Sequence, residues 1–167
     1  LGSGSGGNAT LVEGGGARVL LDAGLGPRQL AERLLSSGVD PATLDAVFLS
    51  HEHGDHARGA AAFSARWGVP LALTSGTRLA AGLAVEKLPP CREIAPGEDV
   101  AVRRLVVRAV AVPHDAAAPV AFVVAAGLSR LGHATDLGHL SKRTVEALRG
   151  CDAVLVESNY EPAMLRD

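Results

Sequence analysis

The sequence centres on one stretch, Ser50-His51-Glu52-His53-Gly54-Asp55-His56, which places four potential metal ligands within six residues. Residues 45–50 have the apolar character of a buried strand, and the alanine-rich residues 57–67 are predicted to form a helix. The histidine-rich stretch is therefore expected to be the loop that leaves the strand. In an extended chain, side chains two residues apart share a face, so His51 and His53 can converge on one ion.

The second half of this stretch is expected to serve a second metal position. Gly54 tolerates backbone conformations that are closed to other residues, so the chain can reverse there. Asp55 and His56 then lie at the start of the helix and turn toward that second position, whereas Glu52 points away. A lone loop histidine is usually solvated, but four ligand-type residues at this spacing predict metal binding.

The rest of the chain predicts a mixed α/β fold. Gly14, Gly15 and Gly16 are typical of a hairpin turn, and Pro27 suits the first turn of a helix that ends before Gly38. The glycine-rich residues 2–7 predict a tight turn rather than a phosphate-binding loop, because they lack the lysine and the following helix of a P-loop. Strands are expected over residues 8–13, 17–22, 45–50, 70–74, 102–112, 120–126, 129–135 and 153–157, and helices over 27–37, 57–67 and 141–148.

The composition is that of an ordinary soluble globular domain. Of the 167 residues, 47% are hydrophobic and 20% are charged, which favours a single domain over residues 1–167 with a core of its own. The formal charge of −2 gives no general attraction to nucleic acid or membrane, and the apolar runs fall short of the ~18 residues that a membrane span needs. Cys91 and Cys151 form no C-x-x-C pair, so we expect a cytoplasmic location and no thiolate metal site. Because the chain begins at Leu1 rather than Met and stops at Asp167, both ends are expected to be cut.

Three further residues extend the pattern. Asp22 follows an early predicted strand, His114 follows the strand that ends at residue 112, and Asp136 follows the strand at 129–135. Together with H-x-H-x-D-H at a strand end, these positions resemble the motifs of the metallo-β-lactamase superfamily. The segments Gly2-Ser-Gly-Ser-Gly-Gly-Asn8, His114-Asp115 with Pro119-Val120 after it, and Glu157-Ser158-Asn159 are similar to those of the WalJ (YycJ) subgroup, which is associated with exonuclease activity on DNA.

This resemblance implies a fold and a ligand set. The fold would be a four-layer αββα sandwich, truncated at its C-terminal side, with the metals in a cleft at one edge of the two sheets. His51, His53 and His114 would hold the first metal, Asp55 and His56 the second, and Asp136 would bridge the two. Asp22 would support the metal-binding loop from behind. The last histidine of the family has no equivalent before Asp167, so one ligand of the second site is missing.

The same resemblance implies a hydrolase that uses a metal-activated water, with Asp55 and Asp136 as catalytic residues and DNA phosphodiester bonds as the substrate. Nitrogen and oxygen ligands without thiolate favour one or two zinc ions, with Mn²⁺ or Fe²⁺ as substitutes. Hydrolysis of thioesters or lactones, which are small-molecule esters, stays open. A non-catalytic metal-binding module also stays open, because a ligand is missing. The oligomeric state is left open.

Several residues have a second interpretation. Asp136 could cap the turn after its strand, and Asp22 could be a plain turn former. His133 is expected to be a core or sheet-face residue rather than a ligand. Arginines 103, 104 and 108 could form a nucleic-acid-facing patch, but arginines that alternate with apolar residues are more often the solvated face of a strand. Aromatic residues make up only 3% of the chain, so a base-stacking platform is not expected.

Overall fold

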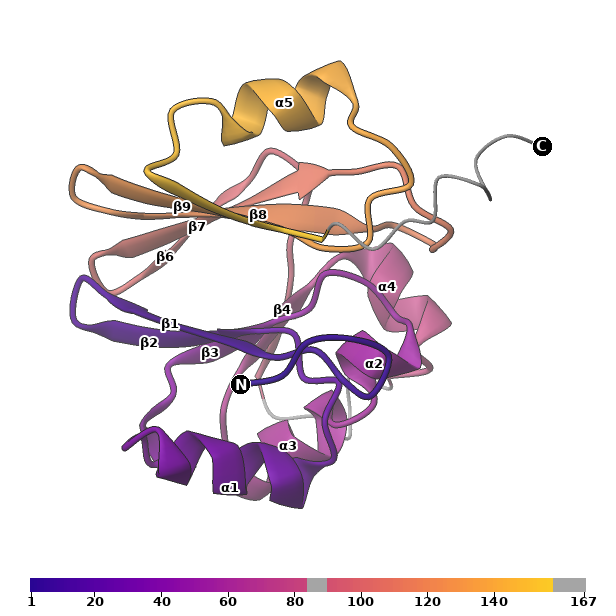
Figure 1. Cartoon of the computed structure of the whole chain (residues 1–167). Coiled ribbons are helices and arrows are strands. Elements are labelled where there is room, and N and C mark those ends of the chain that lie inside the picture. Colours follow the sequence, from indigo (N-terminus) through magenta and orange to yellow (C-terminus); the bar gives the residue numbers. More distant parts are fainter. Residues whose placement is uncertain (84–89, 158–167) are drawn as a thin grey trace.

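The structure, a computed structural model, describes residues 1–83 and 90–157. Within those residues, two five-stranded sheets pack against each other, and helices cover their outer faces (Figure 1). The first sheet has the order β1-β2-β3-β4-β5, with β1 (Thr10–Gly14), β2 (Ala17–Leu21), β3 (Ala46–Phe48), β4 (Leu71–Leu73) and β5 (Cys91–Glu93). The second has the order β10-β9-β8-β7-β6, with β6 (Asp99–Val102), β7 (Leu105–Ala111), β8 (Val120–Ala126), β9 (Ser129–Ala134) and β10 (Ala153–Val156).

The helices complete the four layers that the resemblance implies. α1 and α3 cover the first sheet and α5 covers the second, whereas the short helices α2 and α4 lie at one end of the sandwich (Figure 1). Within the described part of the chain, the helices are too short and too polar to span a membrane. Their bounds are α1 (Pro27–Ser36), α2 (Gly54–Ala57), α3 (Ala60–Trp67), α4 (Ser75–Ala80) and α5 (Lys142–Leu148), with a 3₁₀ turn η1 (Pro41–Thr43).

Successive side chains of the central strands point to opposite faces of their sheet, which explains why each sheet packs against helices on one face and the other sheet on the other. In β2, Leu20 packs into the cluster shared with α1 and α3, whereas its neighbours Val19 and Leu21 pack into the cluster between the sheets. Successive side chains of a strand point to opposite faces, so a strand covered on both sides needs apolar residues throughout. Between the sheets, the rings of Phe48 and Phe122 meet edge to face with centroids 5.8 Å apart.

The topology brings several strand ends to one end of the sandwich. β2, β3 and β4 are parallel neighbours, so the residues that follow them, Asp22, Ser50 and Thr74, lie along one sheet edge. The second sheet is tied to the same end, because the N–H of Val120 at the start of β8 donates to the carbonyl of Ser50 at 3.0 Å. The loop between β7 and β8, which carries His114, therefore lies beside the histidine-rich loop.

Two predicted elements were wrong in their extent. The predicted strand over 102–112 is the hairpin β6–β7, whose turn is formed by Arg103 and Arg104. Arg103 has φ of 53°, a left-handed conformation that glycine or asparagine usually signals, so the turn carried no sequence signal. The predicted helix over 57–67 is divided into α2 and α3 at Gly59, where an added Cβ would lie 2.0 Å from the carbonyl oxygen of Leu25. The short elements α4 and β5 were not predicted.

Candidate metal centre

Histidines from two separate segments meet at the end of the sandwich where α2 lies. His51 and His53 leave β3, and His114 follows β7. One ring nitrogen from each of these three histidines lies within 4.8 Å of the other two, and His114 Nε2 is 3.2 Å from His53 Nδ1. These three are the residues predicted for the first metal.

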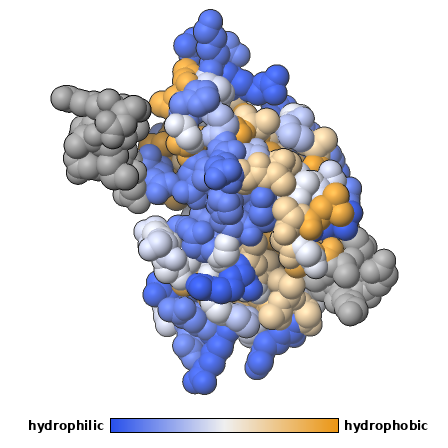
Figure 2. Space-filling view, turned by 90° about the vertical axis from the view of Figure 1, so that its right-hand side faces the viewer, coloured by the Kyte–Doolittle hydropathy of each residue, from blue (hydrophilic) through white to orange (hydrophobic). Residues whose placement is uncertain are grey.

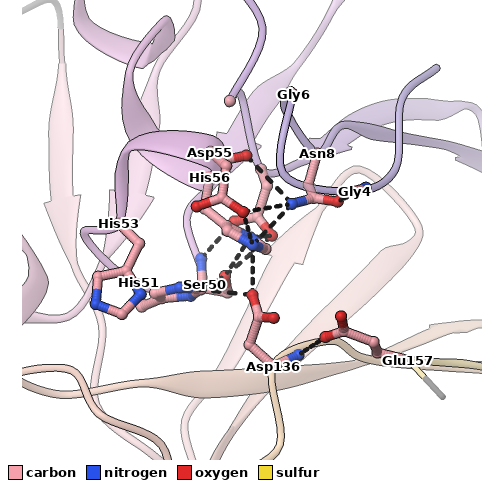
Figure 3. Close-up of polar contacts among 12 residues, drawn as sticks. Gly4, Gly6, Asn8, Ser50, His51, His53, Asp55, His56, Asp136 and Glu157 are labelled. Atoms are coloured by element: carbon pink, nitrogen blue, oxygen red, sulfur yellow. Dashed lines mark hydrogen bonds and ion pairs between the residues drawn. The ribbon is translucent and has the colours of Figure 1, made fainter. Parts of the chain in front are cut away.

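A second set of ligand atoms adjoins the first. His51, His56 and Asp136 also place one ligand atom each within 4.8 Å of the others. His51 thus belongs to both sets, and Asp136 Oδ2 contacts His56 Nε2 and lies 3.6 Å from His51 Nε2 (Figure 3). Among the described residues, Asp55 belongs to neither set, although its Oδ2 is 3.5 Å from His56 Nε2.

Asp22 fixes the orientation of two of the histidines from behind. Its carboxylate is fully buried, accepts the N–H of Ser50 at 2.8 Å and the hydroxyl of Ser50 at 2.9 Å, and lies 2.8 Å from His56 Nδ1. Because the Ser50 hydroxyl donates to Asp22, its oxygen can accept from His51 Nδ1, which is 2.9 Å away. Both rings are then held with Nδ1 as the donor, and both Nε2 atoms face Asp136.

The electrostatics of this pair of histidines suit a bound cation. Burial, followed by the positive charge of nearby His56, lowers the pKa of His51 to about 4, so His51 is neutral at pH 7. Burial also lowers the pKa of His56, but the hydrogen bonds with Asp136 and Asp22 outweigh it and raise the pKa to about 10. The hydrogen bond from His56 in turn holds the pKa of Asp136 well below its usual range. A positive charge is thus favoured between His56 and Asp136.

The residues present fit a divalent metal ion. His51 Nε2 is buried and has no hydrogen-bond partner among the described residues, although it faces the other ligand atoms. Buried nitrogens are seldom left without a partner, and a metal ion would supply one. Imidazole and carboxylate are the ligands that zinc, manganese and iron accept, and an ion bound by His56 would replace the proton that His56 carries in the metal-free protein.

Asn8 joins the glycine-rich loop to this site. Its Oδ1 accepts the N–H of Gly4 at 2.9 Å, which fixes the amide so that Nδ2 faces Asp55 Oδ2 at 3.2 Å (Figure 3). The backbone N–H of Asn8 also donates to the carbonyl of Asp55 at 2.6 Å. Gly24 is required in the same place, because a Cβ there would lie 1.6 Å from the Asp55 carbonyl oxygen.

Asp22 and Asp136, the two candidate site aspartates outside residues 50–56, both have an unusual backbone conformation. Asp22 and Asp136 have φ of 62° and 53°, in the left-handed region that non-glycine residues seldom adopt. Such conformations persist where the surrounding structure over-determines them, and they cluster at functional sites. The turn-forming interpretation of Asp22 therefore describes its backbone, while its side chain supports His56.

A cavity of about 660 Å³ adjoins the ligand cluster. It lies between the glycine-rich loop and the end of β10, and it reaches Asp55 and Asp136. Figure 2, which faces the end of the sandwich where α2 and α4 lie, shows hydrophilic surface across the middle of this face. The described lining of the cavity includes Glu157 but neither Lys nor Arg, so an anionic substrate there depends on bound cations.

Other residues considered in the sequence lie outside both ligand sets. His133 is buried in β9, and its Nε2 lies 3.1 Å from Thr10 Oγ1 on the first sheet. Arg103 donates to Asp45 at 2.7 Å and Arg108 to Asp99 at 2.6 Å. A second cavity, of about 530 Å³, lies beside Arg103 among paired charges.

Arg103 and His114 lie at opposite ends of β7, a strand of seven residues and so roughly 20 Å long. The arginine patch is therefore not part of the metal centre.

Sequence reasoning missed three supporting residues: Asn8, Ser50 and Glu52. Asn8 was noted only as part of the glycine-rich motif, and Ser50 only as the residue before His51. Glu52, which was expected to point away from the cluster, belongs to neither ligand set among the described residues and accepts the N–H of Ala117 at 2.7 Å. The contacts of Asn8 with Asp55, of Ser50 with Asp22 and of Glu52 with Ala117 join residues far apart in the sequence, which a motif of consecutive positions does not connect.

Comparisons with known proteins agree with this geometry. The family model of the beta-lactamase superfamily domain matches residues 17–165. The chain is 27% identical over 170 residues to the exodeoxyribonuclease WalJ of Streptococcus pneumoniae, which covers 99% of this chain and 63% of that protein. It is 26% identical over 168 residues to the exodeoxyribonuclease YycJ of Bacillus anthracis, covering 99% of this chain and 64% of that protein. The chain thus spans less than two thirds of the length of these relatives.

A solved structure agrees in fold. MEM-A1, a subclass B3 metallo-beta-lactamase from a soil metagenome library, superposes with a TM-score of 0.69 at 21% identity, over 90% of this chain and 73% of that one. Two sheets with outer helices, a histidine and aspartate cluster at one end, and a family model that matches most of the sequence lead to one conclusion. The chain belongs to the family of beta-lactamase superfamily domains. It has the metallo-β-lactamase fold, which implies binding of a divalent metal.

Proposed function

We propose that the complete gene product is a metal-dependent exonuclease that hydrolyses phosphodiester bonds of DNA. Its metal ligands would be His51, His53, Asp55, His56, His114 and Asp136. The observation that carries the proposal is the convergence of His51, His53 and His114, because one ring nitrogen from each lies within 4.8 Å of the others. The choice of DNA is supported by the two relatives named exodeoxyribonucleases, which match 99% of this chain.

A divalent ion at this site would supply Lewis acidity, which lowers the pKa of a water toward 7, and positive charge for a phosphodiester transition state. Zinc is the first choice, with Mn²⁺ or Fe²⁺ as alternatives, because the ligands are imidazole and carboxylate without thiolate. The role of the protein is to hold these ligands in place and to provide proton acceptors beside them.

We propose Asp136 as one such proton acceptor. Its Oδ2 lies beside both His56 Nε2 and His51 Nε2, and its side chain keeps 23% of its surface exposed toward the cavity. Asp55 is similarly placed, with 33% of its side chain exposed and one oxygen held by Asn8. These carboxylates can orient an attacking water and accept its proton.

The test is a substrate panel on the complete gene product, loaded in turn with Zn²⁺, Mn²⁺ and Fe²⁺. We expect mononucleotides to be released from linear DNA, no cleavage of covalently closed circular DNA, and loss of release in His53→Ala. Turnover of a thioester or a lactone without turnover of DNA would assign the site to another substrate class. Metal binding with no turnover of any of these substrates would indicate a non-catalytic metal-binding module.

A further inference from the structure

Glu52 belongs to neither ligand set among the described residues, but it binds the loop that carries His114. The backbone N–H of Ala117 donates to Glu52 Oε1 at 2.7 Å, and 65 residues separate the two partners. Glu52 lies between His51 and His53 in the sequence, so one loop supplies two histidines on one side and this carboxylate on the other.

The loop that Glu52 binds has little regular structure of its own. It joins β7 to β8 and is closed by a hydrogen bond from the N–H of Val112 to the carbonyl of Pro119 at 3.2 Å. Within it, the N–H of Ala116 donates to the carbonyl of His114 at 2.9 Å. Such a segment takes up a single conformation only when other parts of the protein hold it.

External contacts hold the loop close to His114. Glu52 binds it at Ala117, and the hydroxyl of Thr74 donates to the carbonyl of Ala118 at 3.0 Å. The ring of His114 then lies 3.2 Å from that of His53, measured from Nε2 to Nδ1. Glu52 and His53 are adjacent residues, so the same short segment contacts the loop twice and sets the position of His114 relative to the other histidines.

We propose that Glu52 is a positioning residue for the first metal set, acting on His114 through the loop of residues 112–119. The inference rests on the proposed function, because it assumes that His51, His53 and His114 hold an ion together. The physical reason is preorganisation: a loop that is already ordered loses less conformational entropy when its histidine binds the metal.

Two substitutions separate this role from a simple effect of charge. Glu52→Gln keeps a carbonyl oxygen that can accept the N–H of Ala117 but removes the negative charge, whereas Glu52→Ala removes both. Glu146→Ala, in the exposed face of α5, is the matched control for loss of one carboxylate. The complete gene product carries each change, and zinc affinity is measured by competition with a chromogenic chelator. Amide hydrogen exchange of residues 112–119 is measured in the metal-free protein.

We expect Glu52→Ala to bind zinc about 10- to 100-fold more weakly, as for other residues that orient metal ligands, and its loop amides to exchange faster. Glu52→Gln and Glu146→Ala should behave like the unchanged protein in both measurements. Equal weakening in Glu52→Gln and Glu52→Ala would assign the effect to charge and overturn the proposal, as would unchanged affinity in Glu52→Ala. If the unchanged protein binds no metal, the proposed function fails. If the loop amides of Glu52→Ala exchange at the unchanged rate, only the inference that Glu52 restrains the loop fails.

Discussion

His56 Nδ1 lies 2.8 Å from Asp22 Oδ2, and both side chains are fully buried. A buried carboxylate that orients an imidazole leaves the opposite ring nitrogen free for a metal and raises the basicity of the ring. Asp22 performs this role while it also accepts two hydrogen bonds from Ser50. Its position after β2 thus links the first sheet to the candidate metal centre.

Replacing Asp22 with asparagine should destabilise the metal-free protein. The asparagine has one acceptor oxygen where the carboxylate accepts three donors, and breaking one partner of a buried ion pair typically costs about 3 kcal/mol. The free energy of unfolding from urea titrations measures the loss. Asp99→Asn, which removes an exposed partner of Arg108, is the control and should cost less than about 1 kcal/mol. Equal losses in the two variants would contradict the role of Asp22.

Metal binding should raise the thermal stability of the chain. A ligand present at 100 times its dissociation constant stabilises the folded state by about 2.7 kcal/mol. For a chain of this length, that corresponds to a rise in Tm of about 5–10 °C, measured by differential scanning fluorimetry with and without zinc. A chelator should reverse the rise. His53→Ala removes a half-exposed candidate ligand of the first set, so its Tm should respond much less; an equal response would place the ion elsewhere.

The sequence predicted the parts of this fold that depend on local patterns. The strand expected over residues 120–126 has those bounds as β8, because a continuous apolar run rich in valine, buried over its first five residues, lies between turn signals. The residues predicted as metal ligands were recognisable because they follow strands whose ends meet at one end of the sandwich. The structure brings His51, His53, His56, His114 and Asp136 into the two ligand sets.

The contacts that support these ligands could not be predicted in the same way. Asn8 and Asp55 are 47 residues apart, and Glu52 and Ala117 are 65 apart, so only the tertiary fold makes them neighbours. The turn at Arg103 escaped notice for a different reason. A positive φ at a residue that is neither glycine nor asparagine, such as Arg103, is not announced by local preference, and the ion-pair partner of Arg103, Asp45, is distant in the sequence.

Gly24 should be intolerant of any side chain. An alanine Cβ there would lie 1.6 Å from the carbonyl oxygen of Asp55, so the segment that carries Asp55 and His56 would have to move. We expect Gly24→Ala to lose about 3 kcal/mol of unfolding free energy, at the upper end of overpacking effects. Gly26→Ala is the matched control, because its Cβ would meet nothing within 4 Å and its φ of −57° suits alanine. Similar stability of the two variants would show that the close packing at Gly24 is not required.

Asn8 should matter for the second metal set more than for the first. Its Nδ2 lies 2.9 Å from Nε2 of His56, a member of the second set, and 3.2 Å from Asp55 Oδ2, and its backbone N–H donates to the Asp55 carbonyl. With alanine at position 8, the backbone contact remains but the carboxylate is free to rotate, and metal affinity at that set should fall about 10-fold. Stepwise zinc titration by calorimetry of the complete gene product separates the two binding events. Ser5→Ala, an exposed change in the same loop, should leave both events unchanged. Loss of the first event rather than the second in Asn8→Ala would mean that Asn8 acts on His51 and His53, which follow β3, and not through His56 and Asp55.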